Sequence, residues 1–415
     1  MIGLPAGHTV ARGPVLADYA AIVGDADLAA LRALARPLQG ARVRMIHGST
    51  VPGSAAEILL RIVPLLTELG LECRREVLAG PEPYQALTNM MRHALQGGPF
   101  DPPPGWRELF RAVSDAQRAR MTFDEDLTVV HDHQPLALVE ARALFRGRWL
   151  WRCHLDVSQP HPDLWAFLRP FVDRYDSAVF SALAFAPALE IPQYLVMPTI
   201  DPLSDKNRDL DAGFVRSVVL KFGIDPDRPI LTQCSRFDRS KDAIGVVAAY
   251  RLVRRFVDCQ LVLAGPTVPD DPDSAVVLRE LQQAAAGDPD IHVLTVPPLS
   301  HLDINALQRA STIVVQKSIR EGFGTTVSDA LWKKRPVVAA NVGGIPAQVI
   351  HKVTGLLAHS VEGTAFQLRY LLANPDVARQ LGERGHQHVR EHFLITHDLK
   401  RYLMLFLTLQ RQARR

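Results

Sequence analysis

The chain has 415 residues, of which 47% are hydrophobic and 22% are charged, and its formal net charge is +3. This length exceeds what one hydrophobic core usually supports, so we expect two domains of roughly 200 residues each. The composition excludes a disordered chain, and so small a charge gives no reason to expect nucleic acid as a partner.

Cysteine usage and the apolar segments indicate the compartment. The first twenty residues lack a basic start followed by an apolar core, so no signal peptide is expected. The most apolar region, residues 178–200, is interrupted by Glu190 and three prolines, which argues against a membrane span. The cysteines are far apart, form no C-x-x-C pair, and are interpreted as reduced thiols of a cytoplasmic protein: Cys73, Cys153, Cys234 and Cys259.

The first half of the chain alternates predicted strands with predicted helices. A leading helix is expected over residues 26–35, and residues 42–47 form the first predicted strand. The small-residue loop Gly48–Ser54 then precedes a helix over residues 55–69. This loop is either a cradle for substrate oxygens or an ordinary connection between a strand and a helix. Further strands are predicted at residues 72–78 and 127–132, within 149–156, and at residues 178–181 and 193–197.

Polar side chains follow two of these strands. Ligands of open parallel sheets gather at the carboxyl ends of strands, so we predict a site here, although a lone histidine is more often structural. The spacing matches no zinc motif such as H-E-x-x-H, so no metal is predicted. The residues concerned are His131, Asp132, His133 and Gln134 after the first strand, and Arg152, His154 and Asp156 after the second.

A polar, proline-containing passage at residues 198–209 is interpreted as the link between domains, and a second series of strands follows it. We therefore expect an α/β fold of two doubly wound, Rossmann-like domains that face each other across a cleft. The expected units are an N-terminal domain (1–205), a C-terminal domain (206–390) and a C-terminal helix (391–415) that packs back on the first domain. The strands of the second series are predicted at residues 229–234, 260–265, 291–295, 312–316 and 336–340.

The loop Ser235–Asp242 carries Arg236 and Lys241. A forked guanidinium and an ammonium group at these positions suit a diphosphate, the first as a bidentate donor and the second as a point charge. Surface charge without a ligand is the alternative interpretation.

The segment Ser318–Trp332 joins a glycine-broken loop to the start of a helix. Gly322 and Gly324 permit a tight turn, and a helix that begins at Thr325 presents free N–H groups and the positive end of its dipole. This arrangement favours phosphate as the ligand. Glu321 and Asp329 are too far apart for shared acid–base work and suit separate contacts to a sugar nucleotide. The alternative is an ordinary turn with a solvated Glu321.

These features resemble the donor-binding domain of retaining family 4 glycosyltransferases with the GT-B fold. The resemblance rests on Arg236 with Lys241, the run Glu321–Gly324, the acid at position 329 and the loop Gly343–Gly344. More narrowly, the chain resembles the trehalose synthases that transfer glucose from a nucleotide sugar to free glucose, and fungal-type trehalose phosphorylases are similar too. The segments that carry this narrower likeness are Val130–Pro135, Trp149–Asp156, Ser235–Asp238 and Glu391–Ile395.

The resemblance implies roles for individual residues. Arg236 and Lys241 would bind the donor diphosphate, Glu321 the hydroxyls of the transferred glucose, and Asp329 the ribose, while His154 would line the reaction centre. The implied catalytic set is His154, Glu321, Arg236 and Lys241. The implied donor-binding set adds Gly322, Phe323, Gly324, Thr325, Thr326, Asp329, Gly53 and Ser54. The implied acceptor-binding set is Asp132, Gln134, Arg152 and Asp156.

The resemblance also implies the partners of the enzyme and leaves alternatives open. The expected substrates are a nucleotide sugar such as UDP-glucose or ADP-glucose and a small sugar acceptor. No cofactor and no metal are expected, and a homodimer is one assembly that the resemblance allows. Three features depart from the family pattern: Asp329 replaces a glutamate, Val51–Ser54 replaces a glycine-rich run, and His133 replaces a proline. A trehalose phosphorylase, a sugar-nucleotide epimerase and a catalytically silent sugar-nucleotide-binding protein therefore stand as alternatives.

Overall fold

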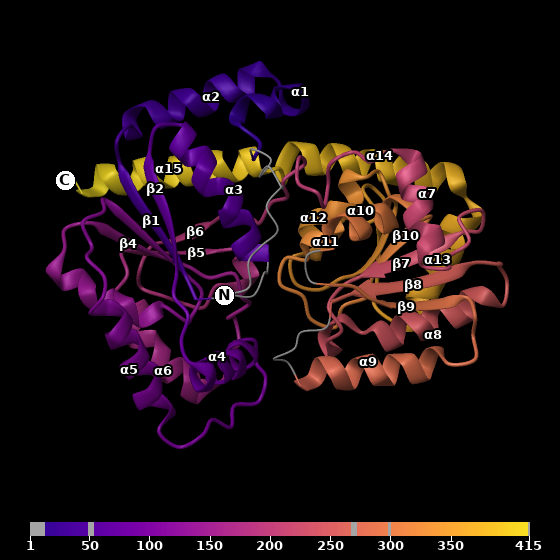
Figure 1. Ribbon diagram of the computed structural model, residues 1–415, viewed down its shortest axis with the longest axis horizontal. Helices are drawn as coiled ribbons and strands as arrows, with labels where there is room; N and C mark the ends of the chain where they lie inside the picture. Colours follow the sequence, from indigo (N-terminus) through magenta and orange to yellow (C-terminus); the bar gives the residue numbers. More distant parts are fainter. Residues whose placement is uncertain (1–12, 49–53, 267–271, 298–299, 414–415) are drawn as a thin grey trace, which may run out of the picture.

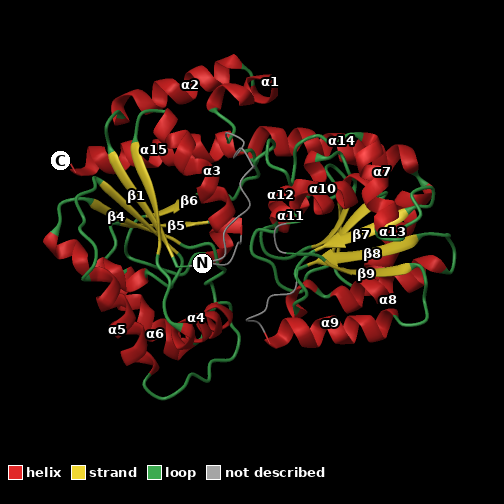
Figure 2. Ribbon diagram, viewed as in Figure 1, coloured by secondary structure: helices red, strands yellow, loops and turns green. Residues whose placement is uncertain are grey.

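The computed structural model describes residues 13–48, 54–266, 272–297 and 300–413. Figure 1 shows two lobes side by side, and Figure 2 shows that each lobe has a sheet at its centre with helices around it. Each sheet has six strands, and every strand pair in it is parallel. The expected α/β fold of two doubly wound halves is confirmed.

The first sheet has the strand order β2-β1-β3-β4-β5-β6. Its strands are β1 (Arg42–His47), β2 (Glu72–Val77), β3 (Leu127–His131), β4 (Arg148–Arg152), β5 (Ser177–Phe180) and β6 (Gln193–Leu195). The α-helices of this half are α1 (Ala20–Val23), α2 (Asp25–Ala35), α3 (Ser54–Glu68), α4 (Glu82–Leu95), α5 (Trp106–Arg118) and α6 (Pro162–Val172). Every residue of β3 is buried, as expected for a central strand of a parallel sheet that is covered on both faces.

The second sheet has the order β12-β11-β10-β7-β8-β9. Its strands are β7 (Ile230–Cys234), β8 (Gln260–Gly265), β9 (Ile291–Thr295), β10 (Ile313–Gln316), β11 (Val337–Ala340) and β12 (Leu356–Ala358). Its helices are α7 (Ala212–Lys221), α8 (Ala243–Arg254), α9 (Pro272–Ala285), α10 (His301–Ala310), α11 (Thr325–Trp332), α12 (Ile345–Gln348), α13 (Val361–Ala373) and α14 (Pro375–His392). Strand β12 was not among the predicted strands.

The strand orders determine where a ligand can bind. The chain reverses its direction of travel across the first sheet between β1 and β3, and across the second sheet between β7 and β10. At such a switch point the loops after two neighbouring strands lead away in opposite directions and leave a crevice at the carboxyl ends of the strands. The loop with Arg236 follows β7, and the loop with Glu321 follows β10. Both therefore lie at the switch point of the second sheet.

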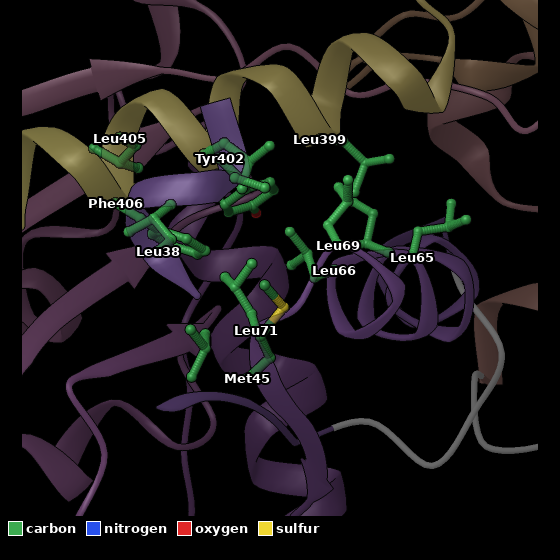
Figure 3. Packing of buried hydrophobic residues seen from close by; sticks show 14 of the residues in the cluster. Leu38, Met45, Leu65, Leu66, Leu69, Leu71, Leu399, Tyr402, Leu405 and Phe406 are labelled. Carbon is green, nitrogen blue, oxygen red and sulfur yellow. The ribbon is translucent and has the colours of Figure 1, made fainter. Parts of the chain in front are cut away.

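The last helix, α15 (Ile395–Ala413), returns to the first half and packs against α2 and α3. Figure 1 shows it as the yellow helix that continues the line of α14 across to the other lobe. Figure 3 shows its side chains Leu399, Tyr402 and Phe406 on the same apolar cluster as Met45 of β1 and Leu66 of α3. The core of the first half is thus completed by residues from the end of the chain.

The chain crosses between the halves twice, and the two crossings lie side by side. The amide of Ile200 donates to the carbonyl of Phe393 at 2.8 Å, and the amide of Ile395 donates to the carbonyl of Ile200 at 2.9 Å. Residue 200 belongs to the predicted link, whereas 393–395 separates α14 from α15. None of the helices in the described ranges has the length and apolar character that a bilayer crossing requires.

Candidate active site

Glu321 and Lys241 form an ion pair in the second half. The Lys241 ammonium, in the turn after β7, lies 2.7 Å from both carboxylate oxygens of Glu321, in the loop after β10. Gln316 and Ser318 also donate to Glu321 Oε2, at 3.3 and 2.9 Å. The side chains of Glu321 and Lys241 are only 7% and 14% exposed. Glu321 is therefore held by three donors rather than solvated.

The turn after Glu321 is fixed by a second glycine loop. Gly324, with a φ of 77°, is the N-cap of α11, so Thr325 and Thr326 open the helix and their N–H groups have no acceptor within it. The amide of Gly344 donates to the carbonyl of Gly322 at 2.7 Å. A Cβ atom on Gly343 would lie 2.8 Å from the carbonyl carbon of Glu321, and closer still to its oxygen. The loop of Gly343 and Gly344 fits against the loop of Glu321 only because neither Gly343 nor Gly344 carries a side chain.

Arg236 and Lys241 lie on either side of Asp238. Arg236 Nη2 is 3.3 Å from the Asp238 carboxylate, and the Arg236 side chain is 44% exposed. Burial alone would raise the pKa of Asp238, but the neighbouring Arg236 and Lys241 hold it below its ordinary value. Both cations thus act on the Asp238 carboxylate, and Lys241 also contacts Glu321 at the start of the glycine turn.

The remaining donor-binding predictions lie at different depths. The Phe323 side chain is buried and packs against Phe393 with ring centroids 5.5 Å apart, so only its backbone faces the loop. Asp329 is also buried, and its Oδ1 accepts from Asn207 Nδ2 at 2.8 Å. Gly53 lies outside the described residues. Ser54 begins α3, but its side chain is not among those described.

In the first half, His154 lies against His131. Nε2 of His154 is 3.1 Å from Nδ1 of His131, and the rings stack with centroids 5.4 Å apart. Burial, reinforced by Arg152, lowers the pKa of both imidazoles well below the ordinary value. Both rings are therefore neutral near pH 7, and one N–H of the pair is shared between the facing nitrogens.

Asp132 supports His154 from the end of β3. Its Oδ1 accepts from the His154 amide at 2.8 Å, and its own backbone has a φ of 62°. A positive φ costs an aspartate free energy, so the hydrogen bond to the neighbouring loop stabilises a conformation that is otherwise rare. Burial raises the pKa of Asp132 to about 6. His154 and Asp132 are thus brought together as predicted from the strand ends.

The other predicted acceptor contacts are dispersed. Arg152 is buried below the loops, where its Nη2 donates to the carbonyl of Val196 at 2.6 Å. Asp156 accepts from the amide of Ser158 within its own turn, at 3.0 Å. Gln134 covers Gly48, where an added Cβ would come within 3.0 Å of its Cγ. Of the four predicted contacts, Arg152 and Asp156, like Asp132, therefore have structural partners that hold their side chains.

His133 is also a core residue. Its ring is buried, and Nε2 lies 2.8 Å from the carbonyl of Thr88 in α4. This histidine therefore anchors α4 to the end of β3. Its side chain does not lie with His131 and His154, and within the described ranges no group of three or more His, Cys, Asp or Glu residues could hold a metal ion.

The two halves meet at these loops. A Cβ atom on Gly322 would lie 3.8 Å from the carbonyl oxygen of His154, which is an ordinary contact distance. The neighbouring Arg320 donates through Nη1 to the carbonyl of Gln96 at 2.7 Å. The glycine turn of the second half thus faces the His154 loop of the first half, with Lys241 and Glu321 at the edge of the same junction.

Three residues that support the candidate site were missed from the sequence: Gln316, Ser318 and Asn207. Gln316 and Ser318 hold Glu321, and a signal for them existed, because both are polar and stand at the carboxyl end of the buried strand β10. Asn207 contacts Asp329 from the link between the halves. No local pattern marks Asn207, because its partner is more than one hundred positions away.

The buried Asp398 of α15, which lies near Arg152, leads to a prediction on how the free energy of unfolding depends on pH. Burial raises the pKa of Asp398 from 3.8 to about 6, although Arg152 and Arg401 oppose the shift. The folded protein therefore holds this proton more tightly than the unfolded chain, and wild type loses stability as the pH rises through this window. Relative to wild type, Asp398→Asn should gain on the order of 3 kcal/mol of unfolding free energy between pH 4 and pH 7.

Urea unfolding of both proteins across this pH range measures the difference. Asp376→Asn, at an exposed acid of α14, is the matched control and should show no such slope. A difference between Asp398→Asn and wild type that does not change with pH would contradict the assignment of a buried, protonated Asp398.

The fold, and the loops of the two halves that face each other, define the structural class of the protein. Two parallel-sheet domains of this topology, with a junction between their strand ends, form the GT-B fold of glycosyltransferases. Sucrose-phosphate synthase from Thermosynechococcus elongatus has the same fold, with a TM-score of 0.69, 19% identity, and coverage of 90% of this chain and 100% of that one. The α,α-trehalose-phosphate synthase of Burkholderia xenovorans also matches, with a TM-score of 0.69, 12% identity, and coverage of 88% and 100%.

Family models and curated relatives narrow the class. Residues 45–187 match the trehalose synthase N-terminal domain, and residues 219–388 match glycosyl transferases group 1. Trehalose synthase from Rubrobacter xylanophilus is 39% identical over 95% of this chain and 97% of its own length. Trehalose synthase from Pyrococcus horikoshii is 36% identical over 94% and 95%. Trehalose phosphorylase from Pleurotus pulmonarius is more distant, 25% identical over 91% of this chain and 58% of its own length.

The chain belongs to the trehalose synthase family of glycosyltransferases. The resemblance drawn from the sequence motifs is thus confirmed, and so is the GT-B fold that it implied. The chain is an enzyme of glycosyl transfer in trehalose metabolism.

Proposed function

We propose that the enzyme transfers glucose from a nucleoside diphosphate sugar to free glucose and forms trehalose with retention of the anomeric configuration. One observation carries this proposal: the Lys241–Glu321 pair and the N-terminus of α11 lie at the junction that faces the His154 loop. A cation and helix N–H groups suit a diphosphate, and the adjacent carboxylate suits sugar hydroxyls. The similar proteins named trehalose synthase support trehalose as the product.

The donor diphosphate would bind to Arg236, Lys241 and the first N–H groups of α11. Departure of the nucleoside diphosphate develops negative charge, and preorganised cations with a helix N-terminus stabilise that charge without a metal ion. Lys241 is paired with Glu321. A bound phosphate would share the Lys241 ammonium, while Glu321 stays oriented by Gln316 and Ser318 and receives hydrogen bonds from the glucose.

The acceptor would bind beside His154 and Asp132. Its hydroxyl oxygen attacks the anomeric carbon as the bond from that carbon to the diphosphate oxygen breaks, and a phosphate oxygen of the leaving group takes the hydroxyl proton. Glu321 is held by Lys241, Gln316 and Ser318, so we assign it to sugar binding and not to a covalent intermediate. Attack on the face from which the phosphate leaves then retains the configuration.

The test is incubation of the enzyme with a panel of nucleoside diphosphate sugars and free sugars, with mass spectrometry of the products. We expect release of a nucleoside diphosphate and formation of a disaccharide whose two anomeric protons both show α coupling in NMR spectra. A donor that changes without any acceptor would indicate an epimerase, and tight binding without product would indicate a silent binding protein. Breakdown of trehalose that requires phosphate and no nucleotide would indicate a phosphorylase.

A further inference from the structure

Three buried residues below the donor loop form a hydrogen-bonded series. Lys333 Nζ donates to Asn207 Oδ1 at 2.8 Å, and Asn207 Nδ2 donates to Asp329 Oδ1 at 2.8 Å. Lys333 and Asp329 are one turn apart on or just after α11, whereas Asn207 belongs to the link between the two halves. All three side chains are buried. The series thus joins an ammonium group to a carboxylate through one amide.

The Lys333 ammonium determines the orientation of the Asn207 amide. Burial lowers the pKa of Lys333 to about 7, although Asp329 opposes the shift. In its ammonium form the group can only donate, so the atom of Asn207 that faces it is the carbonyl oxygen, and the NH₂ group faces Asp329. The other two contacts of Lys333 are also acceptors, Gln308 Oε1 and the carbonyl of Asp329, both at 2.9 Å. Three donors thus meet three acceptors. The amide therefore has only one orientation in which every contact is a hydrogen bond.

Asp329 is held at one oxygen only. Asn207 occupies Oδ1, and no residue in the described part of the chain donates a hydrogen bond to Oδ2. Lys206, next to Asn207, is close enough for Asp329 to raise its pKa, but its ammonium pairs at 2.9 Å with Glu57 of α3. One oxygen of the carboxylate is fixed, and the other has capacity for a ligand.

We infer that Asn207 and Lys333 position the Asp329 carboxylate so that its second oxygen receives the ribose hydroxyls of the donor nucleotide. This inference rests on the proposed function and on the ribose contact that the family resemblance implies for Asp329. An aspartate fixed at one oxygen presents the other in a constant direction, and preorganisation of this kind lowers the ordering cost of binding. Asn207 and Lys333 touch no substrate in this arrangement and act through Asp329.

The test compares nucleotides with and without ribose hydroxyls. Isothermal titration calorimetry measures the dissociation constants of UDP and ADP and of their 2′,3′-dideoxy analogues for wild type, Asn207→Ala and Lys333→Met. For the nucleotide that wild type binds more tightly, we expect each substitution to weaken binding about tenfold, as loss of one hydrogen bond to a charged group does. Binding of the dideoxy analogue should not change.

The inference would be overturned if both variants bound the parent nucleotide and its dideoxy analogue more weakly by the same factor, because that result indicates general damage to the site. No weakening of either would also overturn it, as would wild type that binds the dideoxy analogue as tightly as the parent. Asn374→Ala, at an exposed helix cap of the same half, is the control and should bind like wild type. The proposed function fails separately, if wild type forms no disaccharide from any nucleotide sugar.

Discussion

Replacement of Lys241 by alanine is expected to lower kcat/KM for the donor by about 100- to 1,000-fold, the usual loss when a preorganised charge contact to the developing anion is removed. The ammonium has two functions in the structure. It would stabilise charge on the leaving diphosphate, and it holds the carboxylate of Glu321 at 2.7 Å. Removal therefore weakens the phosphate contact and also leaves a nearly buried carboxylate without its cation.

Steady-state kinetics with varied donor at saturating acceptor measures this loss. Arg236→Ala should be less severe, because the Arg236 side chain is 44% exposed and its contact is screened more by water. Lys221→Ala, at a side chain that is 61% exposed on α7, is the control and should keep wild-type kinetics. Near-native kcat/KM in Lys241→Ala would remove this residue from the mechanism.

Replacement of Gly343 by alanine is expected to lower kcat/KM by at least about 100-fold, comparable to the cost of misplacing a catalytic group by 1 Å. The added methyl group would lie 2.8 Å from the carbonyl carbon of Glu321, and the residue has a φ of 57°. An L-residue in this region pays a backbone cost of roughly 1–2 kcal/mol, and the contact forces the peptide of Glu321 to move. Because Gly344 also binds the Gly322 carbonyl, the shift extends to the start of α11.

Kinetics together with thermal unfolding separates this effect from loss of fold. Gly363→Ala is the control, because a Cβ there meets its nearest neighbour, Ser360 Oγ, at 3.4 Å. We expect Gly343→Ala to remain folded, with a modest decrease in Tm and a large decrease in kcat/KM. Wild-type kcat/KM in this variant would mean that the position of the Glu321 peptide does not matter for transfer.

Sequence reasoning was accurate where a property is local. The largely apolar, β-branched runs of β3 and β10 identify buried parallel strands, and Gly322 and Gly324 after β10 identify the turn before α11. The strand order then places the loop of Lys241 beside the loop of Glu321, because both follow strands at the switch point. Much of the donor side could therefore be predicted.

The acceptor side could be predicted only in part, because its residues depend on distant segments. The alternation of side chains along β4 predicts that Trp151 and Arg152 point to opposite faces of the sheet. It does not predict that α15 covers the face with Arg152. The structure places Arg152 near Asp398, nearly 250 positions away, so its role changes from ligand contact to internal support. The contact of Asn207 with Asp329 was missed for the same reason, because no residue near Asn207 in the sequence indicates that Asp329 is its partner.

The return of α15 to the first lobe has a consequence for biosynthesis. Leu399, Tyr402 and Phe406 are among the α15 side chains that complete a core whose other buried members come from the first 200 positions. During translation those early segments leave the ribosome long before the final helix exists, and they carry an uncovered apolar surface in the meantime. The lobe made first thus closes only after α15 has been made, and we expect a nascent chain of this enzyme to depend on α15, or on a chaperone until α15 emerges, to avoid aggregation.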